Sequence, residues 1–292
     1  MTNVEPRWTQ GGRVTLVYQP MAGGAEALAR LCADALAGFG AAPEVLASTD
    51  LGPGGCVDDS RLAVTFGGDG TILRTAQWLG GRAIPIVGVQ MGRLGFLAEV
   101  VPGDVPGALF PYIEGDWWPD RRAMLEGCIR ASTGSASLEC AGATPSGSVL
   151  ALNDVVVCRG ASPRTVAIDL ALGDRFLHTF RCDGLIVASA TGSTAYSFAA
   201  GGPILAPESR ELVVTAICPH ISSLRTLVLP GDSPLRLHVR TTETAVATFD
   251  GQTDLPVRDG GVVEVRRSSH VTVFARRGTP ADFYSRVLSK LG

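Results

Sequence analysis

Short apolar runs alternate with amphipathic segments over about the first 100 residues. Runs rich in β-branched and aromatic residues predict strands, while apolar residues spaced three or four apart predict helices. The predicted strands are 13–19, 43–47, 62–66 and 84–89, and the predicted helices are 25–38 and 72–79. Strands that alternate with helices are typical of βα units on a parallel sheet. We therefore expect an α/β domain at the N-terminus.

The pattern changes after Glu114. Short apolar segments recur there between turn residues, and they predict a mainly antiparallel β domain. These segments are 155–158, 166–172, 185–188, 212–217, 235–239, 245–249 and 262–266. Small polar residues at 133–147 predict a mobile hairpin tip or loop. Apolar residues at helical spacing predict a last helix over 282–291.

These elements together predict an α/β plus all-β fold. We expect an N-terminal α/β domain over 1–115 and a C-terminal β domain over 116–270, with the segment 271–292 closing back on the N-terminal domain. Hydrophobic residues make up 46% of the 292 residues and charged residues 18%. This composition supplies enough apolar material for two cores and too little charge for a disordered chain.

Charge and composition limit the classes of partner. The formal net charge of -3 argues against broad binding to nucleic acid or to an anionic membrane. No uncharged apolar run reaches the roughly 18 residues that a membrane-spanning helix needs. The N-terminus also lacks a signal-peptide core. The seven cysteines show no Cys-x-x-Cys and no zinc-type spacing, so we expect reduced thiols and assign no metal ligand. A soluble cytoplasmic protein is expected.

Lysine is almost missing from the chain, and this restricts how phosphate can be bound. Lys290 is the only lysine. The lysine-dependent phosphate loop of P-loop kinases is therefore excluded. Any phosphate clamp must use arginine, backbone N–H groups or a metal ion.

A glycine-rich turn, Gly67-Gly68-Asp69-Gly70-Thr71, lies between a predicted strand and a predicted helix. Such a turn lets a ligand approach the backbone closely, and the open N–H groups of the helix start suit phosphate. Asp69 would repel phosphate unless it accepts a hydroxyl proton or holds a metal ion. The alternative is an ordinary turn in which Asp69 caps the helix. Arg74 is a second phosphate candidate, or else a solvated arginine on the helix face.

Two further segments could bind a nucleoside. An apolar strand at 183–188 runs into small hydroxyl residues and Tyr196, which could hydrogen-bond and pack against a planar heterocycle. The alternative is a polar loop with Ser/Thr turns. Asn153 and Asp154 fit a ribose diol or a purine edge, or else form a strand-entry turn. Asp250-Gly251-Gln252 reads by itself as a hairpin turn.

In order and spacing, these motifs resemble those of the NAD kinases. The resemblance rests on 67–71, 88–99 (GVQMGRLGFLAE), 153–154, 183–203, 217–220 and 250–252. The glycine-rich turn is shared with diacylglycerol, sphingosine and phosphofructokinases. The stretch from Asp183 to Tyr196 is far more specific. The resemblance covers roughly residues 60–255, which is most of the chain.

The resemblance implies a Rossmann-like, phosphofructokinase-like N-terminal domain and a C-terminal β-sandwich that carries a dinucleotide pocket. It implies transfer of the γ-phosphoryl of ATP, or of another phosphoryl donor, with Mg²⁺, to the 2′-hydroxyl of the adenosine ribose of NAD. Asp69 would take or orient the 2′-hydroxyl proton, and Gly70 would lie against the nucleotide. The family works as dimers or tetramers, so a homodimer or homotetramer that binds small-molecule nucleotides is implied.

The resemblance also implies roles for single residues. Asn153 and Asp154 would hold adenosine, and Asp183 would hold the nicotinamide end. The residues expected to line or adjoin the adenine pocket are Thr194, Ala195, Tyr196, and Ser197 to Ala199. The residues expected to contact the dinucleotide, often from a neighbouring subunit, are Arg164, Arg181 and Gln252.

Several positions depart from the family pattern. Gln90 stands where Asn is usual, and Ser189-Ala190 replaces Thr-Pro, which removes a rigid φ before the hydroxyl-rich loop. These departures leave open a related kinase that phosphorylates a different nucleotide or nucleoside. A noncatalytic dinucleotide sensor is also open, although it would not need Asp69. A lipid kinase shares the glycine-rich turn but is contradicted by the stretch from Asp183 to Tyr196.

Overall fold

We describe the protein from a computed structural model of the whole chain. The described residues are 11–52, 59–92, 95–130, 147–161, 164–220 and 224–291. They divide into two compact units, which we call the first unit (Met1–Arg121 and Thr272–Gly292) and the second unit (Arg122–Val271). Most of the segment predicted as a mobile loop, 133–147, lies outside the described residues.

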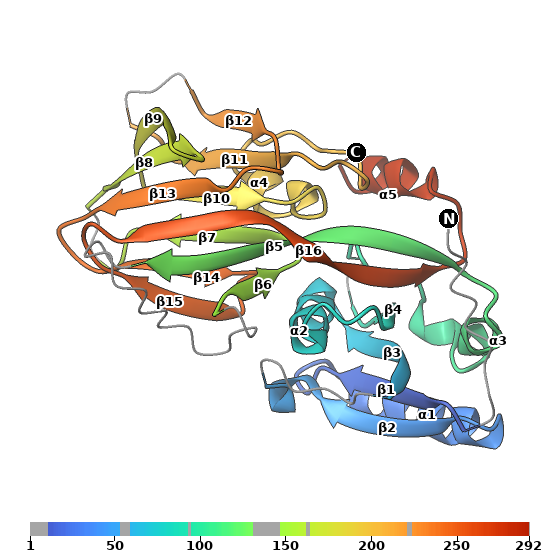
Figure 1. Cartoon of the computed structure of the whole chain (residues 1–292). Coiled ribbons are helices and arrows are strands. Elements are labelled where there is room, and N and C mark those ends of the chain that lie inside the picture. The colour runs from blue at the N-terminus through green and yellow to red at the C-terminus, as the bar shows by residue number, and fades with distance from the viewer. Residues whose placement is uncertain are drawn as a thin grey trace. The chain divides into compact units, whose positions relative to one another are not determined.

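The first unit is built on a parallel sheet (Figure 1). Its strands run in the order β2-β1-β3-β4, and every pair is parallel. The end of a later strand, β16, joins β4 in parallel, with Val273 opposite Pro85. The strand bounds are β1 Arg13–Tyr18, β2 Ala42–Ala47, β3 Ser60–Gly67, β4 Pro85–Gln90 and β16 Val262–Arg276. The α/β prediction for this part of the chain is confirmed.

Helices accompany this sheet. The α-helices are α1 Ala25–Gly38, α2 Asp69–Leu79, α3 Phe110–Glu114 and α5 Asp282–Leu291, and the short 3-10 turns are η1 Ser48–Asp50, η2 Pro102–Asp104 and η3 Gly107–Leu109. One core is formed by the apolar face of α1 and the inward side chains of the strands, among them Leu36, Leu16, Val64 and Phe66. The helix α2 begins at Asp69, three residues before its predicted start at 72. Asp69 and Gly70 carry no apolar signal, so periodicity could not show the true start.

The second unit consists of antiparallel strands. One sheet has the order β12-β11-β10-β7-β14-β15. A second group pairs β16, β13, β8 and β9, while β5 pairs with β16 and with β6. The bounds are β5 Trp118–Arg130, β6 Val149–Ala151, β7 Asp154–Cys158, β8 Val166–Leu172, β9 Arg175–Cys182, β10 Gly184–Ala188, β11 Leu212–Ile217, β12 Thr226–Leu229, β13 Leu235–Arg240, β14 Ala245–Phe249 and β15 Thr253–Val257. The mainly antiparallel β prediction is confirmed.

The two groups of strands in the second unit share one core. Leu185 and Val187 of β10 contribute to it, as do Leu237 of β13 and Val265 of β16. The segment between β10 and β11 contains η4 Gly192–Thr194 and α4 Tyr196–Ala199. Within the described residues, no helix combines the length and the apolarity needed to cross a bilayer.

Candidate active site

The glycine-rich turn after β3 brings the backbone close to its own helix. A Cβ on Gly67 would lie 2.1 Å from Oγ1 of Thr71, so only glycine fits there. Gly68 is the cap residue of α2 and no side chain caps the helix, although Gly68 accepts a hydrogen bond from the N–H of Thr71 at 3.0 Å. The capping role considered for Asp69 is therefore not what the structure shows. The start of α2 keeps backbone N–H groups that suit an anion.

The carboxylate of Asp69 is directed at a second turn of the first unit. Its Oδ2 accepts a hydrogen bond from the N–H of Phe96 at 2.7 Å, and its Oδ1 accepts one from the N–H of Leu97 at 3.1 Å. A Cβ on Gly95 would lie 2.0 Å from Oδ1 of Asp69, so the turn can approach the carboxylate only with glycine at this position. Two backbone donors thus fix the direction of the carboxylate. Each carboxylate oxygen accepts one of them and keeps a lone pair for a further donor.

Gln90 holds this second turn in place. The side chain is buried at the end of β4, and its Oε1 accepts a hydrogen bond from the N–H of Gly95 at 2.9 Å. The departure from Asn therefore has a structural function in this chain. The motif at 88–99 pointed to this segment, but its backbone contacts with Asp69 could not be found from the sequence.

Arg74 lies half-buried on α2. Its Nη1 donates to the carbonyl oxygen of Ser48 in η1, at 3.4 Å. The side chain is thus turned toward the end of β2, which is also the carboxyl edge of the parallel sheet. Its half-buried position lies between the phosphate candidate and the solvated arginine considered as the alternative. Carboxyl edges of parallel sheets are the usual place for ligands in α/β domains.

A pocket of about 360 Å³ opens in the second unit. It brings together residues that the sequence separates by almost 100 positions, because β7, β14 and the loop before α4 meet there. Its lining residues are Asn153, Asp154, Val156, Cys158, Ala195, Tyr196, Thr248, Asp250 and Gly251. Four of the candidate residues, Asn153, Asp154, Ala195 and Tyr196, are therefore neighbours. Cys158 and Thr248 were missed, because neither belongs to a recognisable motif.

Asp250 organises the floor of this pocket. Its Oδ2 accepts a hydrogen bond from the N–H of Leu152 at 2.7 Å, and its Oδ1 accepts hydrogen bonds from the N–H groups of Asn153 at 2.7 Å and Asp154 at 3.1 Å. Its own N–H donates to the carbonyl oxygen of Asp154 at 3.0 Å. The residue has a φ of 53°, a left-handed conformation that Asp and Asn tolerate better than most residues. By itself the sequence indicated a hairpin turn here, and the resemblance included 250–252 among its motifs.

Asp154 differs from Asp250 in its surroundings. Burial, and then the neighbouring carboxylate of Asp250, raise the pKa of Asp154 to about 7. The side chain is 6% exposed. Beside it, the side-chain oxygen Oδ1 of Asn153 is buried and accepts no hydrogen bond from any described residue. A buried acceptor without a donor is costly, so this oxygen is suited to a hydroxyl or amine donor of a ligand.

The hydroxyl-rich loop before Tyr196 is held mostly by its own hydroxyls. Ser189 Oγ donates to the carbonyl oxygen of Leu152 at 2.6 Å, and Thr194 Oγ1 donates to that of Thr191 at 3.1 Å. Ser197 Oγ lies 2.9 Å from Oγ1 of Thr215. These hydroxyls bond within the fold, as the polar loop of the alternative interpretation would, and they fix the loop. The loop presents Ala195 and Tyr196 to the pocket, and Tyr196 is 46% exposed.

The remaining candidates are not among the residues that line this pocket. Asp183 pairs with Arg159, whose Nε lies 3.2 Å from its Oδ1. Arg164 and Arg181 are exposed, and so is Ala199 on α4. Gln252 is half-buried in the turn between β14 and β15, where its N–H donates to the carbonyl oxygen of Phe249 at 2.9 Å.

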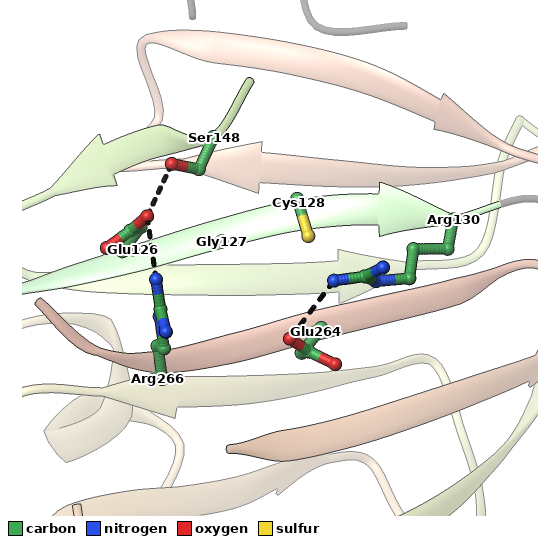
Figure 2. Close-up of a pocket in the computed structure, with 7 residues that line it drawn as sticks. All are labelled: Glu126, Gly127, Cys128, Arg130, Ser148, Glu264 and Arg266. Atoms are coloured by element: carbon green, nitrogen blue, oxygen red, sulfur yellow. Dashed lines mark hydrogen bonds and ion pairs between the residues drawn. The ribbon is translucent and has the colours of Figure 1, made fainter. Parts of the chain in front are cut away.

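Figure 2 shows a second, smaller hollow in the same unit, of about 120 Å³. Its lining residues are Glu126, Gly127, Cys128, Arg130, Ser148, Glu264 and Arg266. Each carboxylate there faces an arginine: Arg266 lies 3.2 Å from Glu126, and Arg130 lies 3.5 Å from Glu264. The charges of this hollow are balanced within it. Across the described residues, His, Cys, Asp and Glu side chains nowhere form a group of three suited to a metal ion.

The first unit has a fixed carboxylate beside a helix N-terminus. The second unit has a pocket in which the buried side-chain oxygen of Asn153 accepts no hydrogen bond from any described residue. These features are typical of an enzyme that binds nucleotides. Comparison with known proteins specifies this class. The model of the ATP-NAD kinase N-terminal domain matches residues 54–117, and that of the ATP-NAD kinase C-terminal domain matches residues 152–277. The chain belongs to the ATP-NAD kinase family, a family of phosphotransferases.

Curated relatives agree with this assignment. The NAD kinase of Heliobacterium modesticaldum is 44% identical over 224 residues, which are 76% of this chain and 75% of the relative. The NAD kinase of Chloroflexus aurantiacus is 33% identical over 280 residues, covering 96% of this chain and 98% of the relative. The similarity therefore extends over both units.

Solved structures share the fold. The crystal structure of an NAD kinase from Archaeoglobus fulgidus in complex with ATP has a TM-score of 0.76 at 24% identity, and covers 95% of this chain and 99% of that chain. The structure of yeast NADH kinase complexed with NADH has a TM-score of 0.80 at 21% identity, and covers 97% and 88%. The two-part α/β plus β architecture is thus that of NAD kinases.

Proposed function

We propose that this chain phosphorylates NAD to NADP with ATP, and that Asp69 is the group that accepts the proton. The observation that carries the assignment is the fixed carboxylate of Asp69. Asp69 lies at the start of α2, and the backbone N–H groups of Phe96 and Leu97 donate to its carboxylate. Both family domains and the curated relatives support the reaction.

The proposed chemistry is a single phosphoryl transfer. The 2′-oxygen of the adenosine ribose forms a bond to the γ-phosphorus, and the bond between that phosphorus and the β,γ-bridging oxygen breaks, so ADP leaves. The 2′-hydroxyl proton passes to the carboxylate of Asp69. Such a transfer needs positioning and charge neutralisation more than covalent help from the protein. The backbone N–H of Gly70 at the start of α2 would support the phosphates, with Arg74 as a further cation.

The pocket of the second unit is proposed to hold the adenosine part of NAD. The orphaned oxygen of Asn153 would accept a hydrogen bond from adenine or ribose, and Asp154 would bind a ribose hydroxyl. Tyr196 offers a ring face for stacking, with Ala195 beside it and Thr194 and Ser197 to Ala199 adjoining. Asp183, Arg164, Arg181 and Gln252 are proposed contacts for the rest of the dinucleotide.

A magnesium ion would enter with the triphosphate and neutralise part of its charge. Mg²⁺ is usually held by one or two carboxylates together with substrate phosphates. The described residues fit that arrangement better than a dedicated protein cage, because they contain no group of three suitable ligands.

The departures from the family pattern do not favour a different acceptor. Gln90 accepts the N–H of Gly95, and Ser189 bridges the carbonyl oxygen of Leu152 and the N–H of Gly192. Both residues have functions within the fold. NAD therefore remains the proposed acceptor ahead of another nucleotide or nucleoside.

We further infer three finer properties from the family resemblance. The first unit would have a Rossmann-like, phosphofructokinase-like fold, and the second would be a β-sandwich. The protein would act as a homodimer or homotetramer, with Arg164 and Arg181 available to a neighbouring subunit. It would work in the cytoplasm, which the free thiols of Cys32 and Cys182 favour.

The direct test is a coupled assay. Purified protein is incubated with ATP, Mg²⁺ and NAD, and the product is read by an NADP-specific dehydrogenase. We expect NADP, which the dehydrogenase distinguishes from other phosphorylated products. If folded protein binds NAD but forms no NADP, the activity proposal is wrong, and a panel of nucleosides and nucleotides then identifies any other acceptor. Binding of NAD without consumption of any triphosphate would instead indicate a sensor.

A further inference from the structure

A buried arginine at the end of β16 has no function in the reaction as described so far. Arg276 is 2% exposed. Its guanidinium lies over the ring of Phe274, 4.7 Å from the ring centroid. A fully buried arginine is uncommon unless it is paired and hydrogen-bonded. All of its partners described below belong to the first unit.

Arg276 joins two segments of this unit through its separate N–H groups. Its Nε lies 3.3 Å from Oδ2 of Asp120, at the start of β5. Its Nη1 donates to the carbonyl oxygen of Leu97 at 2.7 Å and lies 3.2 Å from Oε2 of Glu99. The contact with Leu97 is the shortest of the three. Arginine can make all of them because its planar guanidinium presents several donors in a fixed geometry.

Leu97 is also one of the two backbone donors to Asp69. Its N–H donates to Oδ1 of Asp69, while its carbonyl oxygen accepts from Arg276. Leu97 is thus held through its N–H by the carboxylate of Asp69 and through its carbonyl oxygen by the guanidinium of Arg276. The orientation of the N–H that aims at Asp69 depends on the position of this residue.

Glu99 strengthens the same support. Its N–H donates to the carbonyl oxygen of Gly88 at 3.0 Å, which ties it to β4. Its Oε1 accepts the N–H of Arg277 at 2.8 Å and lies 3.4 Å from the hydroxyl of Tyr112. Burial, and then the charge of Glu99, raise the pKa of Tyr112 above its ordinary range. Arg276 is therefore set in a fixed polar network.

We propose that Arg276 is a positioning residue for phosphoryl transfer, which orients Asp69 through the peptide of Leu97. The inference rests on the role proposed above for Asp69. Arg276 touches neither substrate nor reacting atom, and it acts only by fixing a donor to the carboxylate. Misplacement of a reacting group by about 1 Å can lower a rate by about 100-fold. Loss of the guanidinium should therefore lower kcat and leave NAD affinity unchanged.

The test compares Arg276→Met with Arg277→Met. Methionine keeps an unbranched apolar stem and removes the guanidinium. Arg277 is the next residue, and its guanidinium pairs with Asp116 on the surface, at 2.8 Å. Steady-state kinetics give kcat, and calorimetry gives the Kd for NAD and the fraction of chains that bind it. We expect kcat per binding-competent chain to fall about 100-fold in Arg276→Met, with an unchanged Kd, and to stay within twofold of wild type in Arg277→Met.

Amide hydrogen exchange supplies a local readout that does not depend on turnover. The amides of Phe96 and Leu97 should exchange faster in Arg276→Met than in wild type or Arg277→Met. Arg276→Lys should recover part of kcat, because one ammonium can still reach the carbonyl oxygen of Leu97. If Arg276→Met does not fold, the double variant Arg276→Met with Asp120→Asn removes a stranded buried carboxylate, and the same expectations apply to it.

The outcomes separate the inference from the proposed function. If the wild-type protein forms no NADP, the function proposal fails, whatever the variants do. If wild type is active and Arg276→Met keeps kcat within twofold, Arg276 does not position Asp69. The inference is also wrong if kcat falls while exchange at Phe96 and Leu97 is unchanged, or if the Kd for NAD rises together with the loss of kcat.

Discussion

Asp69 in the first unit and Asp154 in the second carry the same functional group in opposite surroundings. Two backbone N–H groups point at the carboxylate of Asp69. Asp154 is buried against a second carboxylate, Asp250, which itself accepts three backbone N–H groups. Backbone donors compensate the charge of a carboxylate, whereas burial beside a like charge opposes it.

The difference separates two kinds of functional group. Two backbone donors fix the direction of the Asp69 carboxylate, as a proton acceptor in a phosphoryl transfer requires. The fold opposes a charge on Asp154, so that group has to be supported by something else. The hydroxyl groups of a ribose could donate hydrogen bonds to the carboxylate of Asp154. The comparison thus predicts that Asp69 controls turnover and that Asp154 links ligand binding to stability.

The largest expected effect is that of Asp69→Asn. The amide has the same shape but cannot take a proton, so we expect kcat to fall by about 1,000-fold or more, equivalent to about 4 kcal/mol. NAD affinity should change by less than about tenfold, or ~1.4 kcal/mol. Kinetics and calorimetry on the same preparation measure both quantities. Loss of folding together with binding would make Asp69 a structural residue instead.

The next effect concerns stability against pH at Asp154. Its pKa is raised in the fold from an ordinary 3.8 to about 7, so between these values the native state binds more protons than the unfolded state. Stability contributed by the neutral acid is therefore lost as pH rises through this window. The full loss corresponds to at most about 4 kcal/mol. Asp154→Asn cannot ionise and should escape this loss.

Urea unfolding at pH 5 and pH 8 measures that prediction. The advantage of the variant over wild type should be clearly larger at pH 8 than at pH 5, because only part of the loss has occurred at pH 5. Asp259→Asn, a change at an exposed carboxylate elsewhere in the second unit, is the control. Equal pH dependence in wild type and Asp154→Asn would mean that Asp154 ionises freely in the fold, and the contrast with Asp69 would disappear.

A smaller effect is expected from Asp250→Asn. Asparagine tolerates the left-handed conformation of this position but offers one oxygen where three N–H groups need acceptors. We expect a loss of about 1–3 kcal/mol of unfolding free energy. Removing the charge of Asp250 should also lower the pKa of Asp154. The pH dependence of NAD binding should then move to lower pH, which calorimetry across pH 5–9 would detect. If the pH profile of NAD binding does not move, the charge of Asp250 does not control the pKa of Asp154.

The motifs of the sequence were sufficient to locate much of the site, because each lies at the end of a strongly apolar strand. Strand β3 leads into the turn at Asp69, and strand β7 begins at Asp154. Strands β5, β6, β9, β12 and β15 were not predicted. Of these, β9, β12 and β15 lie at sheet ends, where exposed residues interrupt the apolar pattern. The contact of Arg276 with Leu97 joins residues 179 positions apart, which no local pattern can show.

The hydroxyl-rich loop illustrates a different limit of the sequence. Composition pointed to donors for a heterocycle, yet Ser193 Oγ donates to the carbonyl oxygen of Ala190 at 2.6 Å and accepts the N–H of Leu205 at 2.9 Å. A hydroxyl can satisfy the backbone or a ligand, and the choice depends on loop geometry that only the folded chain sets. The ring of Tyr196, by contrast, does not compete for backbone hydrogen bonds, and Tyr196 lines the pocket.

The smallest effect is expected from Tyr196→Ala. Tyr196 lines the pocket that contains Asp154 and is 46% exposed, so its ring can stack on a planar base. We expect the Kd for NAD to rise by about tenfold, or about 1.4 kcal/mol, with kcat within about twofold of wild type. Phe176→Ala, a change at an exposed aromatic residue on β9 of the same unit, is the control. If both variants weaken NAD binding equally, or neither does, the pocket beside Asp154 does not stack the base on Tyr196. A rise confined to Tyr196→Ala would assign adenosine to the second unit and leave proton transfer to Asp69 in the first.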